Sequence, residues 1–219
     1  MKKLLLISIL ACLMVGLFAV TTLGGVTLYI ETATNGEWEY EDLDHDIDQT
    51  NDLSMTNIGL DIVARRFICG FELMKGTETA ELIYGGDADF TAFDFKIGFR
   101  PINKEHFNLG IIARLNSKLY DNDYDTSYYA TLIGVNLGFN ISDIVYIEGS
   151  AAFSIAGYVE GDDGYNYYDE DAYCAIIKAK CTYFLTKHLG MSVGYQYYSY
   201  IIDDEYESQT TDSSLTAGL

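Results

Sequence analysis

The chain has 219 residues, of which 33 are acidic and 13 are basic, so its formal net charge is −20. This excess of negative charge argues against nucleic-acid partners, because their phosphates would be repelled. Proline occurs once, whereas tyrosine occurs 19 times and glycine 20 times. Strands tolerate no internal proline and favour aromatic residues, so the composition indicates an all-β protein.

The N-terminus has the composition of a secretory signal peptide. Two lysines follow the initiator methionine, and an uncharged, largely apolar stretch then runs from Leu4 to Ile30. A basic start followed by an apolar run is typical of such signals. From Val26 onward apolar and polar residues alternate as in a strand. We therefore assign residues 1–23 as the signal peptide and 24–219 as one domain, with an uncleaved helical anchor as the alternative.

Ten segments of the domain alternate between apolar and small or polar residues with the period of two that strands show. They lie at about 25–40, 54–63, 67–79, 87–100, 107–119, 126–141, 144–159, 171–185, 188–202 and 211–219. The pattern is clearest where two of them meet at Ser142 and Asp143. Several exceed the roughly five or six residues usual in soluble sheets and are long enough to cross a membrane when tilted.

The connections between these segments alternate in length and composition. The short ones are Ala64 to Arg66, Pro101 to His106, Ser142-Asp143 and Thr186-Lys187, and the longer ones, rich in acid, tyrosine and glycine, are Glu41 to Asp52, Ala80 to Gly86, Tyr120 to Asp125, Glu160 to Glu170 and Asp203 to Asp212. Short turns on one side and long loops on the other are typical of outer-membrane barrels. The sequence thus predicts an antiparallel, up-and-down transmembrane β-barrel of ten strands, with eight strands as the alternative.

In its signal peptide, its alternating glycine and aromatic strands and its ending from Asp212 to Leu219, the chain resembles the small bacterial outer-membrane β-barrel domain family. The resemblance covers nearly all of the mature chain but includes no unique motif. It implies a place in the bacterial outer membrane, contact with its lipid, and insertion by the barrel assembly machinery. Such barrels usually end on Phe or Trp, whereas this chain ends on Leu219, so either the last strand is cut short or the assembly signal is atypical.

Charged residues occur on the polar face of the predicted strands in nearly equal numbers. We predict a lumen charge network of the acids Glu31, Asp61, Glu72, Asp94 and Glu148 and the bases Lys96, Arg100, Arg114, Lys118, Lys178 and Lys180. This balance favours a salt-bridged, filled lumen. A ten-stranded barrel is little wider than the eight-stranded kind that side chains just fill, which argues against a wide aqueous pore. We expect Lys178 and Lys180 to pair with acids such as Glu148 on the adjacent strand.

Other candidate sites are weaker. The segment from Asp44 to Asp48 places carboxylates at i, i+2 and i+4 as a calcium loop does, but Gln49 and Met55 replace the expected glycine and glutamate, so a solvated acidic loop is favoured. Cys174 and Cys181 lie seven residues apart on one predicted strand and cannot pair with each other. No cluster has metal-ligand spacing, and we expect no metal and no cofactor.

The tyrosines between Asp162 and Asp171 are flanked by acids. They could bind a partner or a sugar, or could belong to the girdle at the membrane interface. His45 lies between two aspartates, which superficially resembles the ten-stranded outer-membrane proteases, but the other motifs of those proteases are missing from this chain. His106 and His188 fall in short turns at the opposite end. We assign no catalytic residue.

The function that the sequence favours is a structural or surface-interaction role in the outer membrane, with acidic, tyrosine-rich loops outside and an extracellular ligand whose type it does not specify. A narrow cation-selective channel is the alternative, and an outer-membrane surface hydrolase is the second alternative.

Overall fold

The computed structural model describes residues 24–42, 47–80, 86–121, 126–162, 167–186, 189–202 and 208–219. They form ten strands: β1 (Gly24–Asp42), β2 (Ile47–Ala64), β3 (Phe67–Ala80), β4 (Gly86–Asn103), β5 (Phe107–Asp121), β6 (Ser127–Ser142), β7 (Val145–Asp162), β8 (Tyr167–Phe184), β9 (Gly190–Ile202) and β10 (Ser208–Gly218). The predicted signal peptide lies outside the described residues.

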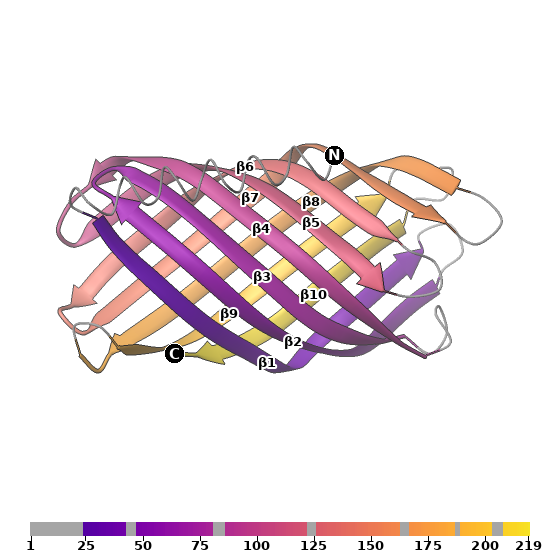
Figure 1. The fold of residues 1–219 in the computed structure, drawn as a ribbon, viewed down its shortest axis with the longest axis horizontal. Helices are drawn as coiled ribbons and strands as arrows, with labels where there is room; N and C mark the ends of the chain where they lie inside the picture. Colours follow the sequence, from indigo (N-terminus) through magenta and orange to yellow (C-terminus); the bar gives the residue numbers. More distant parts are fainter. Residues whose placement is uncertain are drawn as a thin grey trace.

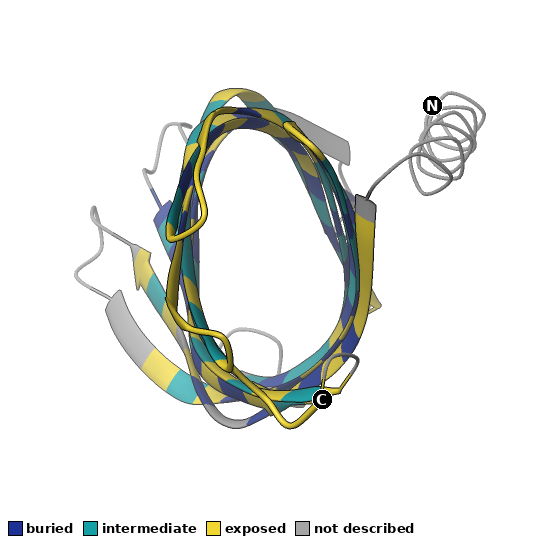
Figure 2. Ribbon diagram, turned by 90° about the vertical axis from the view of Figure 1, so that its left-hand side faces the viewer, coloured by how far each residue is buried: buried dark blue, intermediate teal, exposed yellow. Residues whose placement is uncertain are grey.

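The ten strands form one closed antiparallel barrel, which confirms the predicted all-β class and strand number (Figure 1). Each strand pairs with its neighbour in the chain, and β1 closes the barrel against β10. The strands are tilted against the long axis, and the cross-section is oval (Figures 1 and 2). Within the described ranges, no helix is long and apolar enough to cross a membrane.

Side chains on each strand alternate between the outside and the lumen, because successive residues of a strand point to opposite faces. Ile111 and Ile112 on β5 show the contrast, with exposed fractions of 57% and 2%. The alternation is visible along most strands (Figure 2). The charged side chains of the middle strands thus lie inside, and the outward positions there are occupied mainly by isoleucine, valine, leucine and phenylalanine, although some apolar side chains such as Ile112 also face the lumen. A largely apolar exterior is typical of a barrel in lipid.

The barrel has two different ends. The turn end, as we call it, carries the β2–β3, β4–β5, β6–β7 and β8–β9 connections, and the hairpin end carries the others. The exposed apolar side chains are concentrated toward the turn end, from Leu28 on β1 to Val193 on β9. Aromatic pairs lie on the exterior at both margins, such as Phe107 with Phe139 and Tyr129 with Tyr158 (ring centroids 5.1 and 4.9 Å apart). Such rows correspond to the aromatic girdles of transmembrane barrels.

The prediction of long acidic loops was wrong in part. Only two to five residues separate successive strands, and β2 begins at Ile47, well inside the loop predicted from Glu41 to Asp52. Thr50, Asp52 and Ser54 face outward on β2 while Leu53 is buried. A strand that leaves the lipid can carry acid on its outer face, so a polar segment need not be a loop. Much of the negative charge therefore lies on strand extensions.

The barrel closes along the seam between β1 and β10. Glu31 lies opposite Gly218, and Ile30 and Leu219 exchange two backbone hydrogen bonds of 3.1 Å. Strand ten thus forms as predicted. Cys174, in the lumen, and Cys181, on the exterior, are not paired with each other, as predicted.

Candidate functional site: the barrel lumen

The lumen contains three layers, which can be followed along β5. From the turn end, the inward-facing residues are Asn108, Gly110, Ile112, Arg114, Asn116, Lys118 and Tyr120. Asn108 borders a cavity, Arg114 belongs to a network of ion pairs, and Lys118 and Tyr120 belong to a packed layer near the hairpin end. The three layers differ from one another in how completely side chains fill them.

The packed layer near the hairpin end is built around Lys118. Its ammonium group lies 2.5 Å from Glu78 Oε1 and 2.5 Å from Asp212 Oδ2, and Lys118 and Glu78 are 1% and 0% exposed. The ammonium also lies 4.6 Å from the ring centroid of Phe90 and 4.9 Å from that of Tyr120. Ion pairing and cation–π contact together compensate the desolvation of this charge.

Apolar side chains complete the packed layer. Those that are fully or almost fully buried in the lumen include Leu53, Met74, Leu132, Ile176 and Tyr198. They come from five different strands and meet in the middle of the barrel. The described residues therefore close the lumen at this level with protein.

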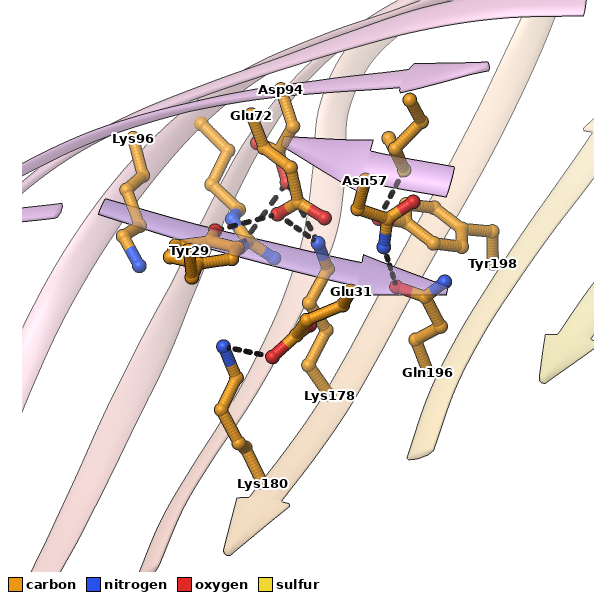
Figure 3. A network of polar contacts seen from close by, with 12 residues as sticks. Tyr29, Glu31, Asn57, Glu72, Asp94, Lys96, Lys178, Lys180, Gln196 and Tyr198 are labelled. Carbon is orange, nitrogen blue, oxygen red and sulfur yellow. Dashed lines mark hydrogen bonds and ion pairs between the residues drawn. The ribbon is translucent and has the colours of Figure 1, made fainter. Parts of the chain in front are cut away.

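The middle layer is a network of ion pairs (Figure 3). Lys178 Nζ lies 2.7 Å from Glu72 Oε2, Lys180 Nζ lies 2.6 Å from Glu31 Oε1, and Arg114 Nη2 lies 3.2 Å from Asp94 Oδ2. A further pair joins Lys96 and Asp61 at 2.8 Å. Space that water can occupy here amounts to only about 40 Å³, room for about three waters at most.

Neutral groups extend the middle layer toward β9. Asn57 donates to Gln196 Oε1 at 3.1 Å, and Tyr29 donates its hydroxyl hydrogen to Glu72 Oε2 at 3.2 Å. Figure 3 shows these side chains converging from β1, β2, β3, β4, β8 and β9. Because partners come from strands far apart in the sequence, the network links opposite walls of the barrel.

The structure places all eleven charged residues of the predicted lumen network on inward-facing positions. The predicted partner of the two lysines is wrong, however. Glu148 is the Cα partner of Lys180, yet Lys180 and Lys178 pair with Glu31 and Glu72. The lysine stems reach across the oval lumen, so cross-lumen distance and not strand adjacency decides the pairing.

Sequence reasoning missed two members of the lumen, Glu78 and Asp212. Both occupy the inward parity of their strands, Glu78 with Glu72 on β3 and Asp212 with Ser214 on β10. Both lie inside the predicted segments 67–79 and 211–219, so following the inward positions to the hairpin end of each segment would have identified them.

The third layer is a cavity at the turn end, which we call the vestibule. It holds about 590 Å³ of space that water can occupy, and its wall includes Arg100, Lys104, Asn108, Asn136 and Glu148. The vestibule is thus more than ten times as large as the cavity in the middle layer.

The weaker candidates fall elsewhere. Asp44 to Asp46, His45 and His188 lie outside the described residues, as do the side chains of Tyr165, Tyr167 and Tyr168. His106 is exposed in the β4–β5 connection. In the ranges that the structure describes, no group of three or more acidic, histidine or cysteine side chains could hold a metal ion.

No protein-family model and no curated protein matches the sequence. Among solved structures, the outer membrane protease OmpT from Escherichia coli superposes with a TM-score of 0.59 at 11% identity, over 88% of this chain and 95% of that one. The chain has the fold of a bacterial outer-membrane β-barrel. At this identity the likeness to OmpT shows the fold and not a shared activity.

Two further outer-membrane barrels superpose more loosely. Neisserial surface protein A (NspA) gives a TM-score of 0.41 at 10% identity, over 89% of this chain and 98% of that one. Ail, the attachment invasion locus protein of Yersinia pestis, solved with the heparin analogue sucrose octasulfate, gives 0.38 at 12% identity, over 90% and 98%. Neither superposition bears on the function of this barrel.

Proposed function

We propose that this chain is a bacterial outer-membrane protein with a closed lumen, whose role is structural or lies in contacts at the cell surface. The observation that carries the proposal is the packed layer around Lys118. There a lysine that is 1% exposed is held by two carboxylates and lies against aromatic rings, which favours a lumen filled by side chains.

The exterior supports the membrane location. Exposed apolar side chains surround the barrel between two aromatic margins, and their transfer from water to lipid is favourable at roughly 25 cal/mol per Å². The partners implied are outer-membrane lipid and the barrel assembly machinery.

The hairpin end is the part that we propose to face outward. Its exposed strand extensions carry Glu37, Glu39, Asp52, Asp87 and Asp89. Such a surface attracts cationic groups and repels anionic ones, so an extracellular ligand of positive charge is favoured over nucleic acid or another polyanion.

A narrow cation-selective channel is the second candidate. The vestibule and the charged middle layer favour it, because charged linings of this kind conduct ions when they are continuous. The packed layer argues against it. No described residue supports the surface hydrolase, and we do not propose it.

Cysteine labelling on intact cells tests the proposed location and orientation. Glu39→Cys at the hairpin end and Asp143→Cys in the β6–β7 connection are both exposed positions. In a variant with Cys69, Cys174 and Cys181 replaced by alanine, a membrane-impermeant maleimide should label Glu39→Cys on intact cells. It should label Asp143→Cys only after the outer membrane is permeabilised.

Labelling of Asp143→Cys alone on intact cells would overturn the orientation. Labelling of neither position before complete lysis would overturn the outer-membrane location. A gel of extracted protein with and without boiling provides the folding control, because a folded barrel and its boiled form should migrate differently.

A further inference from the structure

Two connections at the turn end carry exposed bases. Arg65 and Arg66 form the β2–β3 turn, and Lys104 begins the β4–β5 connection, residues 104–106. All three side chains are exposed, and none of them has an ion pair with the described part of the chain. Their positive charge is therefore available to a partner outside the protein.

Hydrogen bonds join these two connections. The backbone amide of Arg100 donates to the carbonyl oxygen of Arg66 at 2.6 Å. The side-chain amide of Asn103 donates to the carbonyl oxygen of Arg65 at 3.0 Å. The β2–β3 turn thus lies beside the end of β4, and the three bases lie on one side of the barrel rim. We call the two connections the joined turns.

An aromatic pair adjoins the joined turns on the exterior of the barrel. Phe67 follows Arg66 directly and is 64% exposed, and Phe99 lies opposite Phe67 on β4 and is 41% exposed. The centroids of the two rings are 5.6 Å apart. Aromatic rows on the outside of a transmembrane barrel lie where the acyl chains of the lipid meet the headgroups. The bases next to this pair therefore lie at the level of the headgroups.

The charge of the joined turns differs from that of the rest of the exterior. In the described turn-end connections the other exposed charged side chains are Glu105 and Asp143, and Asp143 belongs to the β6–β7 connection. The joined turns thus carry three bases and one acid in a chain whose net charge is −20. The exposed strand extensions at the hairpin end carry acids such as Glu37 and Asp52, and Lys75 is the one base that faces outward on a described strand. The joined turns therefore attract an anion, and the hairpin end repels it.

We infer that the joined turns bind the phosphate group of an anionic phospholipid, such as phosphatidylglycerol, in the leaflet at the turn end. This inference rests on the proposed outer-membrane location. Arg65, Arg66 and Lys104 attract the phosphate, because guanidinium and ammonium groups are strong donors to phosphate oxygens. The acyl chains pack against Phe67 and Phe99 on the exterior. A lipid thus satisfies both parts of this surface, whereas a free anion satisfies only the bases.

Native mass spectrometry of the refolded barrel in detergent tests this inference. Phosphatidylglycerol and zwitterionic phosphatidylcholine with the same acyl chains are titrated separately, and the dissociation constant of the first bound lipid is measured for each. The first phosphatidylglycerol should bind about fivefold more tightly, which is the factor expected for one base beside the phosphate. Glycerophosphoglycerol, the same headgroup without acyl chains, should show no binding at these concentrations.

Removal of the three bases should remove the preference. In Arg65→Gln/Arg66→Gln/Lys104→Gln, the dissociation constants of the two lipids should lie within about twofold of each other. Arg65→Lys/Arg66→Lys retains both charges and should retain the preference, which separates the charge from any effect on the turn. Lys75→Gln is the matched control, because it removes the outward-facing base toward the hairpin end and should leave the ratio unchanged.

Equal dissociation constants for the two lipids in the wild type would overturn the inference, and so would loss of the preference in Lys75→Gln. Binding of glycerophosphoglycerol as tight as that of the lipid would indicate a site for free anions and would overturn it as well. If the triple variant does not refold, Lys104→Glu decides, because it reverses one of the three charges, and an unchanged ratio would contradict the site.

A gel with and without boiling shows whether each protein is folded before the titration. A wild-type barrel that refolds and shows no preference contradicts the lipid site alone. A wild-type chain that never shows the shifted migration of a folded barrel contradicts the proposed membrane location, so the two failures are distinguishable.

Discussion

The two halves of the lumen differ in how completely side chains fill the space around buried polar groups. Near the hairpin end, Lys118 has two carboxylate partners and three aromatic neighbours, and apolar side chains fill the remaining space. Near the turn end, Arg100 and two asparagines border a cavity of about 590 Å³. A barrel of one width can thus be closed in one half and open in the other, because side-chain size and glycine placement set the local diameter.

The largest expected effect comes from removing the charge at the centre of the closed half. Lys118→Met leaves Glu78 and Asp212 buried and facing each other without a cation. Loss of one partner of a buried ion pair costs roughly 3–5 kcal/mol, and we expect the free energy of unfolding in lipid vesicles to fall by that amount.

Glu78→Gln is the matched control, because it leaves Lys118 paired with Asp212 and should cost less than half as much. Equal costs for Lys118→Met and Glu78→Gln would show that the cluster is not organised around the lysine.

The next effect concerns the exterior, where a new charge should cost more on the apolar part than on the polar part. Ile133 lies on the apolar exterior of β6 and is 49% exposed, so Ile133→Arg should reduce the free energy of unfolding by roughly 2–4 kcal/mol if it meets the middle of the bilayer. Thr50→Arg lies on the polar exterior of β2, opposite Glu39, and should cost about 0–1 kcal/mol. Urea unfolding in vesicles measures both, and similar costs would contradict the position of the apolar belt.

A smaller effect distinguishes paired from unpaired acids on the turn side. Glu31→Gln removes the partner of Lys180 and should lower the free energy of unfolding by roughly 1–3 kcal/mol. Glu148→Gln removes a carboxylate that has no ion pair among the described residues, and should cost less. A larger cost for Glu148→Gln than for Glu31→Gln would instead support pairing of the lysines with Glu148, as strand adjacency predicted.

A further effect concerns pH and the closed half. Glu78 lies beyond the apolar part of β3, where its outward neighbours are Thr77 and Thr79. Burial raises the pKa of its carboxyl group from 4.5 to about 7, with Asp212 adding to the rise and Lys118 opposing it. The folded state therefore holds a proton that the unfolded state releases near pH 4.5, so this contribution to stability falls as the pH rises from about 4.5 to 7.

The difference in free energy of unfolding between the wild type and Glu78→Gln, measured at several pH values, isolates this contribution. Wild-type stability should decline relative to the variant across that interval. A constant difference would show that Glu78 titrates as an ordinary surface acid.

Much of the barrel could be predicted from alternation alone. The period of two identified all ten strands and assigned residues such as Glu72 and Lys178 to the lumen. It does so because outward residues in the lipid are apolar while their neighbours in the lumen can be polar. Outside the lipid, outward-facing residues can also be polar, so the alternation is less distinct. For that reason the polar start of β2 resembled a loop in the sequence.

The pairing inside the lumen could not be predicted in the same way. Lys180 meets Glu31 across the barrel from a strand that is not its neighbour, and that contact depends on closure, register and the oval cross-section.

Conductance in planar lipid bilayers tests most directly whether the packed layer around Lys118 closes the lumen. Refolded wild-type barrel, shown to be folded by its shifted migration without boiling, should insert without producing steady current steps in potassium chloride. Steady, cation-selective steps from the wild-type barrel would contradict the closed lumen and favour the narrow channel instead.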